Sequence, residues 1–179
     1  AGISALQALQ VATVRWDTTV SEISVSPGPF AMAFDGANMW VTHAVFAGTV
    51  VKMRASDGAN LGTFSVGIRP RGIAFDGANV WVSCEGSNNG TKLLASDGLV
   101  LGTFPVGLTP IGVAHDGTNI WVANSSSSSN SVTKLRASDG ANLGTFPAGA
   151  NPFWVVFDGA NIWVSNESGT VTKLRASDG

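Results

Sequence analysis

The 179-residue chain carries few charges, 12% of its residues, with a formal net charge of −2 and a mean hydropathy of +0.22. This balance excludes a disordered chain, and the lack of clustered positive charge argues against a nucleic acid partner. No apolar run reaches the roughly 18 residues of a membrane span, so we expect no membrane partner. Cys84 is the single cysteine, which rules out an internal disulfide and a thiolate-rich zinc site.

The first 30 residues differ from the rest of the chain. Residues 1–19 are expected to form an N-terminal extension, in which 3–11 is the one stretch with a helical pattern and 11–17 has the composition of a strand. Residues 20–30 are predicted to be a closing strand, because 20–25 and the following Pro-Gly-Pro-Phe match segments that recur later in the chain.

Beyond residue 30 the sequence repeats with a period of about 40 residues, which is typical of propeller blades. Trp40, Trp81, Trp121 and Trp163 mark the same position in each repeat, at spacings of 41, 40 and 42 residues. An Ala-Ser-Asp-Gly phrase recurs at 55–58, 95–98, 137–140 and 176–179, and Leu-Gly-Thr-Phe recurs at 61–64, 101–104 and 143–146. The chain is therefore predicted to be one domain, residues 1–179, with four blades centred on the four tryptophans.

Each repeat contains four short β-prone runs separated by turn residues. In the second repeat, 72–75 and 80–83 flank Asp76-Gly77, a tight hairpin signal. In the third, 132–136 and 143–146 flank a second Asp-Gly turn. These runs predict an all-β chain, a β-propeller of four-stranded antiparallel blades whose tryptophans pack between neighbouring blades.

Ring closure has three possible solutions at this stage. The last repeat stops after its third strand, and the strand at 20–25 would complete it and remove an open sheet edge. The sequence is compatible with a four-bladed ring, with two chains that form one eight-bladed homodimer by ring completion or strand exchange, and with a fragment of a longer protein.

The phrases Trp163-Val164-Ser165-Asn166 and Trp121-Val122-Ala123-Asn124 resemble the YVTN repeat of bacterial and archaeal propellers, with Trp in place of Tyr. The run 70–76 is similar to the start of an NHL-type or virginiamycin B lyase-like blade, and the resemblance covers residues 20–179. It implies a binding platform with varied partners. The more distant lyase resemblance implies a seven-bladed enzyme that uses His, Glu and magnesium, and this chain is too short for seven blades.

Variation among the repeats is concentrated in two sets of loops, which should meet on one face near the propeller axis. One set joins consecutive blades and the other follows the Trp-bearing strand. Because loops on a rigid scaffold carry recognition, we expect a shallow site there for a polar ligand such as a sugar or a peptide, or for a protein. Its candidate residues are Phe30, His43, Arg69, Arg71, Glu85, Asn124, Phe153, Asn166 and Glu167.

The leading functional hypothesis is a non-enzymatic binding or scaffolding propeller, without catalytic residues, metal or cofactor. A lyase-like or hydrolytic enzyme that uses His43, Glu85 and Glu167 is the first alternative, and a self-assembling repeat fragment without a ligand is the second. The recurring Asp-Gly carboxylates are interpreted as turn residues, and the Lys-x-Arg pairs of the third strands as a solvated rim. Low charge and polar loops favour an extracellular or periplasmic location.

Overall fold

The computed structural model describes residues 22–45 and 47–179, and all strands in this part belong to four antiparallel sheets, here called blades 1 to 4. Blade 1 holds β1 (Pro29–Phe34), β2 (Asn38–His43), β3 (Thr49–Arg54) and β4 (Asn60–Ser65). Blade 2 holds β5 (Pro70–Phe75), β6 (Asn79–Cys84), β7 (Asn89–Leu94) and β8 (Val100–Pro105). Blade 3 holds β9 (Pro110–His115), β10 (Asn119–Asn124), β11 (Ser131–Arg136) and β12 (Asn142–Pro147). Blade 4 holds β13 (Pro152–Phe157), β14 (Asn161–Asn166) and β15 (Thr170–Arg175).

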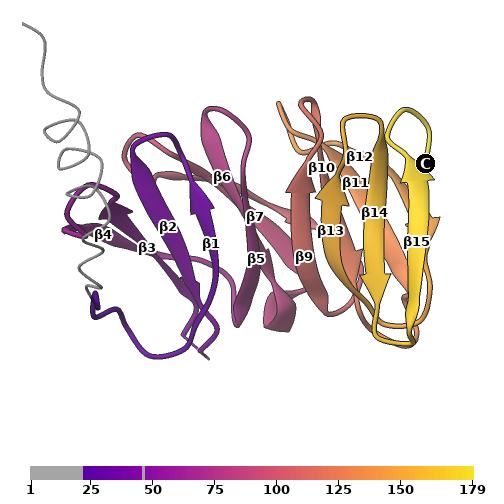
Figure 1. The fold of residues 1–179 in the computed structure, drawn as a ribbon, viewed down its shortest axis with the longest axis horizontal. Coiled ribbons are helices and arrows are strands. Elements are labelled where there is room, and N and C mark those ends of the chain that lie inside the picture. The colour runs from indigo at the N-terminus through magenta and orange to yellow at the C-terminus, as the bar shows by residue number, and fades with distance from the viewer. Residues whose placement is uncertain (1–21, 46) are drawn as a thin grey trace, which may run out of the picture.

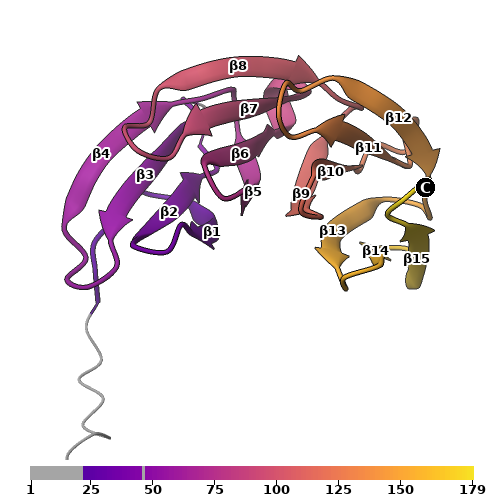
Figure 2. The same cartoon turned by 90° about the horizontal axis from the view of Figure 1, so that it is seen from above.

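The blades stand side by side along an open arc (Figures 1 and 2). In each blade the strands pair in chain order, so β1, β5, β9 and β13 line the inside of the arc and β4, β8 and β12 its outside. This arrangement confirms the predicted all-β propeller fold. Among the described residues, no helix has the length and apolar character that a membrane crossing requires.

The recurring Asp of the first turn in each blade does more than form the hairpin. Asp76 accepts hydrogen bonds from the backbone of Ala78 and Asn79, and its second oxygen accepts one from Trp81 Nε1 at 2.9 Å. Burial would raise the pKa of these carboxyls, but the bonds from the indole, the amide and the backbone lower that of Asp35 in blade 1 from 3.8 to about 2. The turn is therefore fastened to the tryptophan at the blade core. The same indole bond is present at Asp35, Asp116 and Asp158.

The lysines of the third strands of blades 1 to 3 are buried between blades, which contradicts the predicted solvated rim there. Lys92 is only 6% exposed; its Nζ donates to the carbonyls of Ala137 and Ser138 in the next blade and lies 5.2 Å from the Trp81 ring centroid. The interior accepts this ammonium because two carbonyls and an aromatic face replace its water. The arginines two residues later remain at the surface and pair with the Asp of the second turn, as Arg136 does with Asp139.

The predicted closure of the last blade is wrong for the single chain. Blade 4 has three strands among the described residues, and residues 22–25 belong to no sheet. Ile23 contacts Gly58, and Val25 packs against the buried Val41 and Val51 of blade 1. Within the described residues, the apolar side chains of this opening segment cover the side of blade 1 that faces away from blade 2. Residues 20 and 21, like the predicted extension 1–19, lie outside the described residues.

Candidate functional site

Each connection between blades contains a residue in the left-handed backbone region, immediately before a proline. Arg69, Thr109 and Asn151 have φ values of 52°, 55° and 53°. Side chains other than glycine rarely adopt this conformation, and it persists only where the surrounding fold enforces it. In the connection that leads into blade 1 the same place is occupied by Gly28, with φ 78°. The connections are thus a rigid set of loops that hold the adjacent side chains at fixed positions.

Charged and aromatic side chains meet at the start of the inner strands of blades 1 and 2. The guanidinium of Arg71 stacks on the ring of Phe30, with Cζ 4.6 Å from its centroid. Glu85, at the start of the 3-10 helix η2 (Glu85–Ser87), binds Arg71 Nε through one oxygen and Arg69 Nη1 at 3.3 Å through the other. The carboxylate therefore orients two guanidinium groups at once.

An exposed tryptophan extends this group toward blade 4. Trp154 is 40% exposed, and its ring centroid lies 6.2 Å from that of Phe30. Phe153 packs edge-on against the same indole at 5.8 Å. We call Phe30, Arg69, Arg71, Glu85, Phe153 and Trp154 the axial cluster. Sequence reasoning missed Trp154, although the signal was present, because the equivalent residues in blades 2 and 3 are Gly72 and Gly112.

Three of the predicted site residues lie beneath the loop face instead of on it. Asn124 is fully buried, and its amide nitrogen donates to Ser131 and Thr133. Asn166 is buried and bonded in the same way in blade 4. His43 is fully buried, with Nδ1 3.4 Å from Thr49 Oγ1, and burial lowers its pKa. These positions cap the ends of the Trp-bearing strands and are not part of the axial cluster.

The structure does not bring together His43, Glu85 and Glu167, the residues of the lyase-like or hydrolytic alternative. His43 is buried, Glu85 is held by two arginines, and Glu167 is exposed on the turn before β15. Within residues 22–45 and 47–179, no group of three or more His, Cys, Asp or Glu side chains is placed to hold a metal ion. Burial raises the pKa of Cys84, despite a contact with Thr91, which disfavours the thiolate form.

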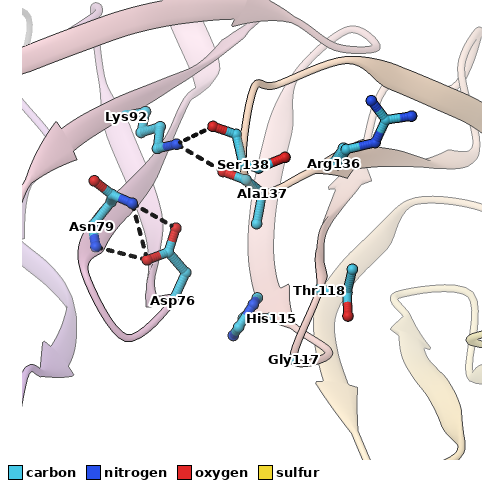
Figure 3. Close-up of a pocket in the computed structure, with 9 residues that line it drawn as sticks. All are labelled: Asp76, Asn79, Lys92, His115, Gly117, Thr118, Arg136, Ala137 and Ser138. Atoms are coloured by element: carbon cyan, nitrogen blue, oxygen red, sulfur yellow. Dashed lines mark hydrogen bonds between the residues drawn. The ribbon is translucent and has the colours of Figure 1, made fainter.

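Away from the axial cluster, a hollow of about 370 Å³ lies between blades 2 and 3, beside the first turns of these blades (Figure 3). His115 points into it, where blades 2 and 4 carry Phe75 and Phe157. The polar groups around it are largely engaged, since Asp76 binds Asn79 and Lys92 binds the backbone of the next blade. Few polar groups of this hollow are therefore free to bind a ligand, and it is not the candidate site.

Searches with the sequence identify no family, since neither a family model nor a curated protein matches it. The fold, by contrast, is similar to solved propellers. Hydrazine synthase from Kuenenia stuttgartiensis matches with a TM-score of 0.77 at 19% identity, over 90% of this chain and 50% of that chain. A virginiamycin B lyase from Staphylococcus aureus matches with a TM-score of 0.73 at 19% identity, over 89% of this chain and 57% of that one.

The computationally designed Ika4 protein is similar over nearly its whole length. It matches with a TM-score of 0.75 at 13% identity, over 87% of this chain and 95% of that chain. This chain spans only about half the length of the hydrazine synthase chain. At such low identities the likenesses show the fold alone, an array of β-propeller blades. Membership of the YVTN or NHL repeats stays a prediction.

Proposed function

We propose that the chain is a binding module that recognises a polar, ring-bearing ligand of the saccharide type at the axial cluster. The observation that carries the proposal is the continuous contact from Trp154 through Phe30 and Arg71 to Glu85, built from three different blades. Residues so distant in sequence converge only because the inner strands line one arc.

The chemistry of the cluster suits such a ligand. An aromatic face stacks on the apolar face of a sugar ring, and an exposed indole contributes a large contact area at low entropic cost. Arg71 and Glu85 add donors and acceptors that are already oriented by their mutual pairing. Because both arginines are held by one carboxylate, the cluster carries a single net positive charge, which favours neutral or singly acidic sugars.

The rigid connections support a preformed site. The left-handed residue Arg69 lies beside Pro70, so the chain that carries Arg71 has little freedom before the ligand arrives. A preformed site loses less conformational entropy on binding than a mobile one.

A glycan array followed by calorimetry of the hits tests the proposal. Trp154→Ala is expected to weaken binding about tenfold, which corresponds to roughly 1.4 kcal/mol. Arg71→Ala should have a similar effect. The matched control is Phe34→Ala, which removes an aromatic ring that is 54% exposed at the other end of β1 and should leave affinity unchanged.

Three results would contradict the proposal. The array finds no saccharide ligand, or the Trp154 and Arg71 variants bind as tightly as the unaltered chain, or a bound compound is converted to product. The last result would support the lyase-like or hydrolytic alternative.

A further inference from the structure

Arg69 occupies a backbone position that does not call for an arginine. It precedes the proline of the connection between blades 1 and 2 and has a φ of 52°. The equivalent positions carry Gly28, Thr109 and Asn151. Glycine and asparagine adopt the left-handed backbone region more readily than other residues do. The reason for an arginine at this position must therefore lie in the contacts of its side chain.

Positive charge is confined to this one connection. The other three connections, 27–30, 107–111 and 149–153, contain neither arginine nor lysine. The connection between blades 1 and 2 leads through Arg69 to Arg71, so it places two guanidinium groups at the start of one inner strand. The set of connections therefore has one electropositive point, and a ligand of the axial cluster meets it on the side of blade 2.

The guanidinium of Arg69 is only partly engaged. Its Nη1 lies 3.3 Å from Glu85 Oε1, and the side chain is 46% exposed. A guanidinium has five N–H donors in a planar fork, and one carboxylate oxygen cannot accept them all. The side chain of Arg71, by comparison, is 20% exposed, with Nε bound to Glu85 and the guanidinium stacked on Phe30. Of the two arginines, Arg69 is therefore the one with more donors available to a ligand.

Glu85 is anchored to the connection that carries Arg69. The backbone N–H of Glu85 donates to the Arg69 carbonyl at 3.0 Å, and the N–H of Gly86 donates to the Ile68 carbonyl at 2.9 Å. The side chain of Glu85 is 14% exposed, and its second oxygen binds Arg71. Because the backbone around this carboxylate is fixed, it holds both guanidinium groups at defined positions before a ligand arrives.

We propose that the ligand of the axial cluster carries a carboxylate, as sugars of the uronic acid class do, and that Arg69 selects it. The inference rests on the proposed saccharide site and names the class of saccharide that it takes. A half-exposed guanidinium can bind a planar carboxylate through two parallel N–H···O bonds, which add direction to the attraction between the charges. Arg69 is thus the specificity-determining residue, and Glu85 positions it.

The charge balance of the cluster matches one carboxylate. Arg69 and Arg71 carry two positive charges and share the one negative charge of Glu85, which leaves one positive charge. One further carboxylate makes the group neutral. A neutral sugar leaves the positive charge without a partner, and a ligand with several acidic groups close together adds like-charge repulsion. A single acidic sugar unit beside the aromatic rings therefore fits the cluster best.

Matched pairs of ligands test the selection. The probes are short oligosaccharides that contain galacturonic or glucuronic acid, each measured beside its methyl ester, which keeps the sugar ring and removes the charge. Calorimetry at low salt should give an affinity about tenfold higher for the acid than for the ester. Arg69→Gln should reduce this ratio to below about twofold. The matched control is Arg136→Gln, which removes an arginine of similar exposure, 47%, at the second turn of blade 3 and should leave the ratio unchanged.

The failure of this inference is distinguishable from that of the saccharide site. Equal binding of acid and ester, or an array on which only neutral saccharides bind, overturns the selection of a carboxylate and leaves the saccharide site in place. The same loss of preference in both arginine variants overturns the role of Arg69. An array without any saccharide ligand overturns the site itself. Salt gives a measurement without a variant: about 500 mM should weaken binding of the acid several-fold more than that of the ester, and equal weakening contradicts the inference.

Discussion

The bond between the turn carboxylate and the blade tryptophan should be a main source of stability, and Asp116→Asn tests this. Asp116 accepts from Trp121 Nε1 at 2.7 Å and from the backbone of Asn119 at 2.6 Å. The side-chain amide introduced by the substitution has one acceptor oxygen, so it can accept only one of these two bonds. Its NH₂ group then faces the N–H donor of the other bond. Since hydrogen bonds to a charged group contribute about 1.5–3 kcal/mol each and Trp121 is fully buried, the variant should lose about 3 kcal/mol of unfolding free energy.

The control is Asp139→Asn in the second turn of the same blade. Asp139 is half exposed; it accepts from the backbone of Ala141 and pairs with Arg136, and it makes no bond to a tryptophan. The loss of unfolding free energy should be clearly smaller than that of Asp116→Asn, because solvent screens an exposed ion pair. Urea unfolding followed by far-ultraviolet circular dichroism measures both. Equal losses for the two variants would refute the reasoning, because turn formation alone would then account for the conserved pattern of the four repeats.

The same bonds predict acid sensitivity. The pKa of Asp35 is lowered from 3.8 to about 2 in the folded chain. A depressed pKa adds stability that is fully present above the unfolded value and is lost as the pH falls through the folded one. This carboxyl should therefore contribute about 1–2 kcal/mol at neutral pH, after allowance for partial screening, and that contribution should disappear between about pH 4 and pH 2. Urea midpoints measured across this range check the slope, and a flat profile would contradict it.

Two further predictions follow from single residues. Thr109→Gly should raise the free energy of unfolding by about 0.5–1 kcal/mol, because it removes the backbone strain of a β-branched residue at φ 55°. Urea unfolding measures this change, and a lower free energy of unfolding would contradict the prediction. Burial lowers the pKa of His43, so below about pH 6.5 the unfolded chain binds a proton that the folded chain does not, and the stability of the fold falls. His43→Asn should remove this pH dependence. Urea midpoints of both proteins at pH 5 and pH 8 measure it, and an unchanged dependence in the variant would contradict the prediction.

The repeat pattern was sufficient to predict the blades, because each Trp falls on the second strand and each Asp-Gly pair on a hairpin. It did not predict the burial of Lys92, since a lysine on an alternating strand indicates solvent unless the carbonyls of the next blade are known. The bond that Trp81 donates to Asp76 was missed for a related reason. Turn formation already explains an aspartate before glycine, so the sequence offered no need for a second role.

The candidate site was predictable in part. Phe30, Arg71 and Glu85 were expected on the loop face, and the structure brings them into contact. Asn124 was expected there too, but it lies against Gly107 of the preceding connection, and a glycine at that position makes room for a buried side chain. Burial of this kind depends on the distance between two loops, which the spacing of residues along the chain does not encode.

Calorimetric titration of the unaltered chain and of Trp154→Ala with a saccharide found on the array tests the central claim most directly, that the axial cluster is a preformed binding site. The account predicts saturable binding to the unaltered chain, weakened about tenfold in the variant. Equal affinities for the two proteins would contradict the claim.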